Sequence, residues 1–161
     1  MGIEIERKFL LKNESWRLDT SGRPRRGTLY RQGYLSRNPA CIVRLRLEGD
    51  EAFITLKGRR QGVRRSEYQY PVPASDCAAM LEELADKPLI EKTRYKVDFD
   101  GLTWEIDEFH GENAGLLVAE VELESEDQAF KLPPWAGEEV SGDSRYANAA
   151  LVNNPFRNWK K

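Results

Sequence analysis

The stretch from Ile3 to Leu11 constrains the fold most, because apolar and charged residues alternate along it. Successive side chains of a β-strand point to opposite faces, which places Glu4, Glu6 and Lys8 together on one face and most of the apolar residues on the other. Two neighbouring carboxylates on one face repel each other. We therefore expect a cation beside them, either a metal ion or Lys and Arg from neighbouring strands.

Seven further stretches have the length and alternation of strands, and short turns join most of them. With the first, the expected strands span residues 3–11, 29–37, 42–47, 52–57, 64–72, 90–99, 102–109 and 116–124. Helices are expected from Ser75 to just before Pro88, over residues 125–130, and from Asp143 or Ser144 through Val152. This order predicts a mainly β protein with peripheral helices (α+β), built on an antiparallel sheet.

Composition limits the classes of protein that this chain can belong to. Its 161 residues suffice for one domain, spanning 1–161, and the balance of 25 basic and 27 acidic residues argues against bulk binding of nucleic acid or of an anionic membrane. No apolar stretch approaches the roughly 20 residues of a membrane helix, and no signal sequence is visible, which favours a cytoplasmic protein. Cys41 and Cys77 lie in unrelated contexts, so we expect small structural hydrophobes and neither a disulfide framework nor a zinc site. The sequence leaves the oligomeric state open, with a homodimer as one option.

Charged residues recur at alternate positions in strand after strand, and residues of the same sign are often paired. An antiparallel sheet with one solvated face would explain the alternation. A sheet closed into a barrel with its charges inside would also explain the same-sign pairs, because a bound anion and its metal could neutralise them. The pattern alone leaves both interpretations open.

If the charges converge, their types restrict the chemistry. Arg and Lys from several strands would form a cage for a chain of phosphates. Carboxylates without His or Cys favour a hard cation such as Mg²⁺ or Mn²⁺. Together these groups suit phosphoryl transfer, and the absence of a Walker-type glycine-rich loop excludes a P-loop enzyme.

Five ordered motifs make the chain resemble the CYTH family, also called triphosphate tunnel metalloenzymes. The first, Glu4-Ile5-Glu6-Arg7-Lys8, matches that family's E-x-E-x-K signature. The others are Arg44-Leu45-Arg46, Thr55-Leu56-Lys57, Glu91-Lys92-Thr93-Arg94-Tyr95 and Ala119-Glu120-Val121-Glu122-Leu123. The resemblance spans residues 3 to about 151 and implies an eight-stranded antiparallel closed tunnel barrel with triphosphate bound at its centre.

Site residues follow from the resemblance, position by position. It implies a metal site, for Mg²⁺ or Mn²⁺, formed by Glu4, Glu6, Asp107, Glu120 and Glu122. The triphosphate would be held by Lys8, Arg44, Arg46, Lys57, Arg65, Lys92 and Arg94. For catalysis, Glu67 or Glu105 would orient the attacking water or a second metal, alongside Lys8.

Metal-dependent hydrolysis of inorganic triphosphate, or short-chain polyphosphate, is the leading functional hypothesis. A class IV-type adenylate cyclase, a thiamine triphosphatase and a non-catalytic polyphosphate- or nucleotide-binding module are the alternatives. The last expected helix either closes one tunnel mouth or packs on the barrel wall.

Overall fold

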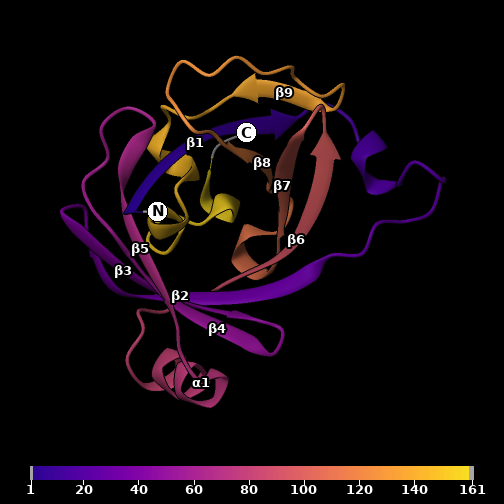
Figure 1. Ribbon diagram of the computed structural model, residues 1–161. Helices are drawn as coiled ribbons and strands as arrows, with labels where there is room; N and C mark the ends of the chain where they lie inside the picture. The colour runs from indigo at the N-terminus through magenta and orange to yellow at the C-terminus, as the bar shows by residue number, and fades with distance from the viewer. Residues whose placement is uncertain (1, 160–161) are drawn as a thin grey trace.

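The computed structural model describes residues 2–159, which contain one antiparallel sheet of nine strands. Eight of the strands form a closed ring, in the order β5-β4-β3-β2-β6-β7-β8-β1, and β1 closes the ring by pairing with β5 (Figure 1). The strands are β1 (Gly2–Leu11), β2 (Thr28–Asn38), β3 (Cys41–Glu48), β4 (Glu51–Lys57), β5 (Arg64–Pro71), β6 (Ile90–Phe99), β7 (Leu102–Phe109), β8 (Leu117–Glu122) and β9 (Ala136–Glu139). The predicted eight-stranded closed antiparallel fold is therefore confirmed.

The ninth strand, β9, was not expected from the sequence. One edge of β1 pairs with β5 over residues 2–5 and, farther along, with β9 at Phe9 and Leu11. β9 has only four residues, and its sequence Ala-Gly-Glu-Glu lacks the alternation that marks a strand. It extends the wall where β5 diverges from β1.

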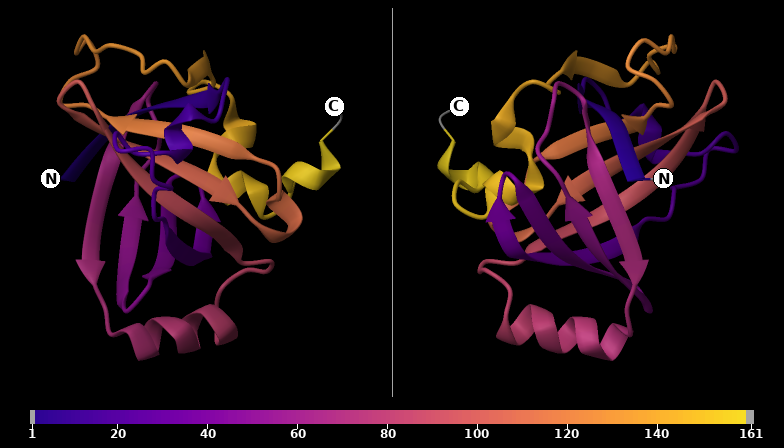
Figure 2. Two further views of the ribbon diagram at one scale, coloured as in Figure 1. Left: turned by 90° about the vertical axis from the view of Figure 1, so that its right-hand side faces the viewer. Right: turned by 60° about the vertical axis from the view of Figure 1, so that its left-hand side comes forward.

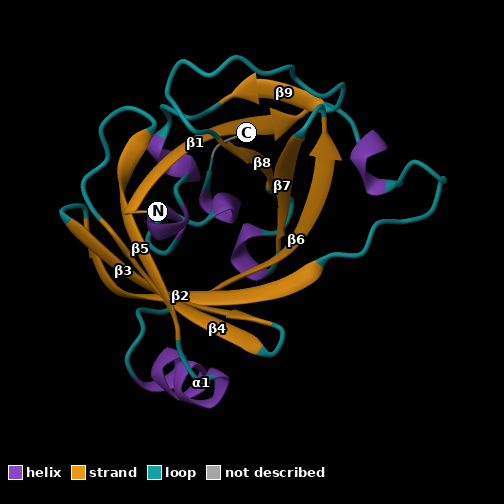
Figure 3. Ribbon diagram, in the orientation of Figure 1, coloured by secondary structure: helices purple, strands orange, loops and turns teal. Residues whose placement is uncertain are grey.

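Helices are short: in Figure 3, α1 (Ala74–Glu83) lies outside the ring, whereas several shorter helices appear within its outline. The helix expected from Ser75 is α1, and the expected C-terminal helix is divided into a 3₁₀ turn, Ser144–Tyr146, and α2 (Asn148–Leu151). The remaining 3₁₀ turns are Ser15–Arg17, Gly111–Asn113 and Phe156–Asn158. The helix predicted over residues 125–130 is wrong, because that segment is a turn followed by irregular chain. None of the helices within residues 2–159 is long and apolar enough to cross a membrane.

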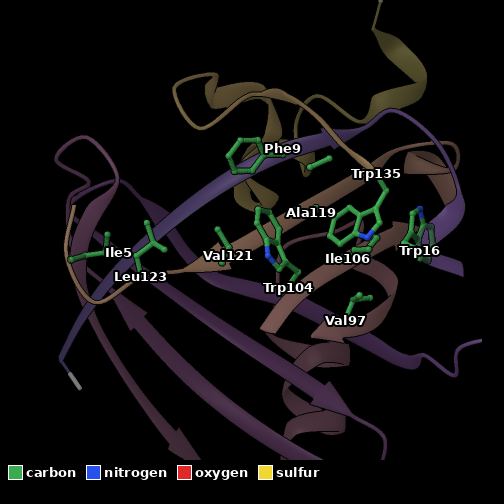
Figure 4. Packing of buried hydrophobic residues seen from close by; sticks show 11 residues of the cluster. Ile5, Phe9, Trp16, Val97, Trp104, Ile106, Ala119, Val121, Leu123 and Trp135 are labelled. Atoms are coloured by element: carbon green, nitrogen blue, oxygen red, sulfur yellow. The ribbon is translucent and has the colours of Figure 1, made fainter. Parts of the chain in front are cut away.

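Three apolar clusters cover the ring and leave its charged face inside. The largest lies outside β1, β7 and β8, where Trp104 packs edge-on against Trp135 from the segment before β9 (Figure 4). In the second, Cys77 and Leu81 of α1 pack against Leu45 of β3. Because apolar surface is buried on the outside, the alternating charged residues face the interior.

The third apolar cluster belongs to one end of the ring. Leu151 and Val152 of the C-terminal segment pack there with Tyr34, Phe109 and Val118. Figure 2 shows the C-terminal segment, in yellow, gathered at this end. One of the two predicted placements of the last helix, at a tunnel mouth, is therefore the observed one.

The exposure of Cys41 differs from the expectation that both cysteines are small structural hydrophobes. Both cysteines are free thiols, and Cys77 is buried as expected, but Cys41 is exposed. It lies at the start of β3, beside the turn from β2.

Candidate functional site

A charged cavity of about 210 Å³ lies inside the ring. Thirteen of the fourteen predicted site residues line it, and they come from seven strands. They are Glu4, Glu6, Lys8, Arg44, Arg46, Lys57, Arg65, Glu67, Lys92, Arg94, Glu105, Glu120 and Glu122. The structure therefore agrees with the second interpretation of the charge pattern, in which the charged side chains face the interior of the ring.

Asp107 is the predicted residue that does not line the cavity. It is fully buried in the wall, where both of its oxygens accept hydrogen bonds of 2.8 Å from Arg94. The Nζ of Lys92 also lies 2.8 Å from Asp107 Oδ2. Burial alone would raise the pKa of Asp107, but the two cations outweigh it and hold that pKa below its usual value.

Glu4 lies at the centre of a buried ion-pair network. Its carboxylate lies 3.3 Å from Lys57 Nζ and 3.4 Å from Arg65 Nε. Lys57 Nζ is also 3.3 Å from a carboxylate oxygen of Glu67. Burial opposes ionisation of Glu4, but Lys57 and the other neighbours prevail, so the pKa of Glu4 is lowered. Glu4 is therefore a carboxylate over the ordinary pH range.

Glu6 and Glu120 form a second group of carboxyls. Burial, and then the charges of Glu120 and Glu4, raise the pKa of Glu6 well above its usual range. Glu120 has a lowered pKa, since Lys8 and Arg94 outweigh its burial. The neighbouring Glu6 carboxyl also contributes to the lowered pKa of Glu120. A cation bound beside Glu6 would oppose this shift and favour its ionised form.

Two more carboxyls have raised pKa values for similar reasons. Burial, followed by the charges of Glu4 and Glu67, raises the pKa of Glu122. Burial and then Glu4 raise the pKa of Glu67. Each of these buried carboxyls therefore lies near other acidic side chains, and a bound metal ion would favour their ionised forms.

Metal binding requires oxygen donors that can converge. Within residues 2–159, no three acidic, histidine or cysteine side chains already form a metal-ready cluster. Several of the cavity carboxylates instead contact Lys or Arg, as Glu120 does with Lys8 at 3.9 Å. The donor set of carboxylates alone nevertheless fits Mg²⁺ or Mn²⁺, because hard oxygen ligands suit those ions.

Arg44 is oriented by side chains that the sequence did not single out as site residues. Its Nη2 donates to Thr55 Oγ1 at 3.3 Å, and Thr55 donates to Gln69 Oε1 at 2.9 Å. The Nε of Arg44 is buried without a hydrogen-bond partner among the described residues. A buried donor of this kind is suited to an incoming anion. Gln69 could have been found from the sequence, since it shares its strand face with Arg65 and Glu67.

The C-terminal segment contributes the end wall of the cavity. Ala147, Asn148 and Ala149 line it, and Asn148 Oδ1 accepts hydrogen bonds of 3.0 Å from Lys92 and from Gln32. Burial lowers the pKa of Lys92 to about 8, although Asp107 opposes that shift. Nothing in the local sequence of the last helix indicated that it supplies Asn148 to the site.

These features define a class of protein: a closed antiparallel β-ring whose interior cations, carboxylates and shielded end wall form a binding site for a multiply charged anion.

Comparison with known proteins agrees with this class. The model of the CYTH domain family matches residues 2–150. A protein of Acetivibrio thermocellus called inorganic triphosphatase is 46% identical over 161 residues, covering 100% of both chains. Another inorganic triphosphatase, from Nitrosomonas europaea, is 42% identical over 157 residues, covering 92% of this chain and 96% of its own. The chain belongs to the CYTH family.

Solved structures share the fold. A crystal structure described as an inorganic triphosphatase superposes with a TM-score of 0.64 at 41% identity, covering 92% of this chain and 97% of its own. A putative adenylate cyclase from Bacillus halodurans has a TM-score of 0.59 at 16% identity, covering 79% of this chain and 84% of its own. The second likeness concerns the fold alone.

Proposed function

We propose that this protein is a metal-dependent hydrolase of inorganic triphosphate, with Mg²⁺ or Mn²⁺ as its metal. The observation that carries the proposal is the convergence of seven Lys and Arg side chains and six Glu side chains on one cavity inside the ring. Two relatives above 40% identity are named inorganic triphosphatases, which supports the same substrate.

The basic residues of the cavity would bind the substrate. Lys92 and Arg44 are both buried in the wall, so the charge they present is weakly screened by water. Arg44 offers paired donors to phosphate oxygens, and Lys57 acts as a point charge. The full set that would hold the phosphates is Lys8, Arg44, Arg46, Lys57, Arg65, Lys92 and Arg94.

Glu4, Glu6, Glu120 and Glu122 would hold the metal, while Asp107 would position Arg94 and Lys92. When bound, the metal supplies positive charge to the phosphate oxygens and makes water a better nucleophile. A phosphate chain would compete with Glu4 and Glu120 for their Lys and Arg partners, which would release carboxylate oxygens toward the metal.

Hydrolysis would then be a single displacement. The oxygen of a water molecule bonds to the terminal phosphorus, the adjacent bridging P–O bond breaks, and orthophosphate and pyrophosphate leave. Glu67 would orient this water and accept its proton, since a raised pKa brings a carboxylate closer to the acidity a general base needs. Glu105, which lies 3.3 Å from Arg94 Nη1, is the alternative.

A substrate comparison tests the proposal. Phosphate release is measured from tripolyphosphate, ATP and thiamine triphosphate with Mg²⁺, with Mn²⁺ and with a chelator. We expect fastest release from tripolyphosphate and none with the chelator. Cyclic AMP as the sole product would instead indicate a cyclase, preference for thiamine triphosphate would indicate that hydrolase, and tight binding without turnover would indicate a binding module.

We also propose that the protein works in the cytoplasm on this small anion, without nucleic acid or membrane as a partner. The two free thiols suit a reducing compartment.

A further inference from the structure

The outer face of β4 and β5 carries apolar side chains that α1 leaves exposed. Tyr68 and Tyr70 of β5 are 50% and 56% exposed, and Ile3 of β1 is 47% exposed. In the register of the sheet, Tyr68 lies opposite Leu56 and Tyr70 lies opposite Ile54, while Ile3 is a diagonal neighbour of Tyr68. Opposite and diagonal neighbours on one face of a sheet are within reach of each other. These five residues form one continuous surface, which we call the tyrosine patch.

The tyrosine patch has the composition of the centre of a protein interface. Along β5 the polar and charged residues face the cavity, and the outward positions between them are Ser66, Tyr68 and Tyr70. Interface centres are enriched in aromatic side chains and depleted in charged ones. Single exposed apolar residues are normal on a protein surface, but a continuous patch across three strands marks a contact site.

Groups of opposite charge flank the patch at the two ends of β5. The loop between β4 and β5 carries Arg59, and β5 begins at Arg64; both are exposed. At the other end of β5, α1 carries three exposed acidic residues, which are Asp76, Glu82 and Glu83. Figure 2 shows α1 at the end of this wall that lies opposite the loop. Within the described part of the chain, none of these five side chains forms an ion pair.

Nearby charges reduce this asymmetry without removing it. The carboxyl of Glu126 lies close to Gly62 of the loop, and Lys87 Nζ donates to the backbone oxygen of Glu82 at 3.2 Å. The loop also contains Arg60, whose Nε donates to the backbone oxygen of Gly62 at 2.7 Å. The loop therefore remains basic and α1 remains acidic, with the uncharged patch between them.

We propose that the tyrosine patch is the centre of a homodimer interface, in which a second copy of this chain packs against it. Two identical faces pack on each other through a twofold axis that lies in the plane of the interface. An axis that runs across the strands brings the basic loop of each copy to the acidic α1 of the other. An axis along the strands would bring like charges together, so charge favours the first arrangement. The inference does not depend on the proposed function.

Sedimentation velocity at micromolar protein concentrations tests the proposal. We expect the wild type to sediment as a dimer with twice the 18.5 kDa mass of the chain. The variant Tyr68→Ser/Tyr70→Ser should raise the Kd of the dimer at least about tenfold, because aromatic residues at the centre of an interface carry much of its binding energy.

The matched control is Leu18→Ser/Leu132→Ser, which shortens two similarly exposed apolar side chains outside the patch. It should keep the wild-type Kd. A wild type that remains monomeric, or a dimer that Tyr68→Ser/Tyr70→Ser leaves intact, would overturn the proposal. Circular dichroism of each variant verifies that it is folded.

Charge reversal tests the orientation of the two copies. Arg59→Glu/Arg64→Glu and Asp76→Lys/Glu83→Lys should each raise the Kd about tenfold, because each places like charges across the interface. All four substitutions in one chain should restore the Kd to within about threefold of the wild type, because the loop and α1 are again of opposite charge. A combined variant that dimerises no better than the two separate ones would overturn the proposal. Phosphate release from tripolyphosphate with Mg²⁺ is assayed separately, so that a failure of hydrolysis is distinguished from a failure of dimerisation.

Discussion

Replacing Asp107 by asparagine removes one negative charge from the wall of the ring while keeping the size of the side chain. The wild-type carboxylate is fully buried, accepts two hydrogen bonds from Arg94 and lies 2.8 Å from Lys92. An amide can accept on one side only, and its NH₂ group would face a cationic donor. The substitution therefore leaves two buried cations without their main partner.

The expected loss of unfolding free energy is large, because removing one partner of a buried ion pair leaves the other charge buried and unpaired. Such changes cost about 3 to 5 kcal/mol of unfolding free energy. Glu120, 3.6 Å from Arg94 Nη2, and Glu105 offset part of the loss, which places Asp107→Asn near the lower bound of about 3 kcal/mol. Since the folded-state pKa of Asp107 is lowered, its contribution is present above the unfolded value of about 4 and is lost as pH falls through the folded pKa.

Equilibrium urea unfolding at pH 7 measures this cost, with the m-value held constant between variants. Glu139→Gln is the matched control, because it breaks the half-exposed pair of Arg7 and Glu139 and should cost under about 1 kcal/mol. A loss for Asp107→Asn no larger than the control would refute the reasoning.

The Mg²⁺ concentration for half-maximal hydrolysis is a second readout for Asp107→Asn, and it should not change. A strong rise in that concentration would show that Asp107 is a metal ligand, as the sequence resemblance implies.

Three further predictions concern the cavity. Glu6→Gln should reduce metal-dependent hydrolysis more than triphosphate binding, and wild-type activity in this variant would remove Glu6 from the site. Lys57→Ala should weaken triphosphate binding by roughly 2 to 5 kcal/mol, which raises Kd at least about 25-fold. The control variant Lys131→Ala, at an exposed position, should have no effect. An unchanged Kd for Lys57→Ala would contradict its role. Because the pKa of Lys92 is lowered to about 8, triphosphate affinity should fall as pH rises above that value. Binding titrations from pH 7 to 10 measure this change. Constant affinity over that range would exclude Lys92 from binding.

Much of this fold could be predicted from the sequence, because strand alternation is a local signal. In β1, Glu4, Glu6 and Lys8 occupy successive even positions and the odd positions are mostly apolar. The same alternation in the other strands indicated which side chains share a face. What the alternation could not decide was whether the charged face points out or in. The family motifs favoured the interior, and the register of β1 with β5 and β8 places Glu4 beside Arg65 and Lys8 beside Glu120.

The differences from prediction have a common physical cause. Asn148 and β9 depend on contacts between segments far apart in the chain, and neither has a distinctive local pattern. Asp107 has the same parity as Glu105 and therefore looks like a cavity residue. Its carboxylate instead lies within the wall of the ring, paired with Arg94 and Lys92.

The most direct test of the central claim is a crystal structure of the protein soaked with tripolyphosphate in the absence of divalent metal. We expect one phosphate chain inside the ring, with its oxygens within hydrogen-bond distance of Arg44 and Lys92 and its end near Asn148. Phosphate density confined to the outer surface of the ring, with the cavity side chains still paired to one another, would contradict it.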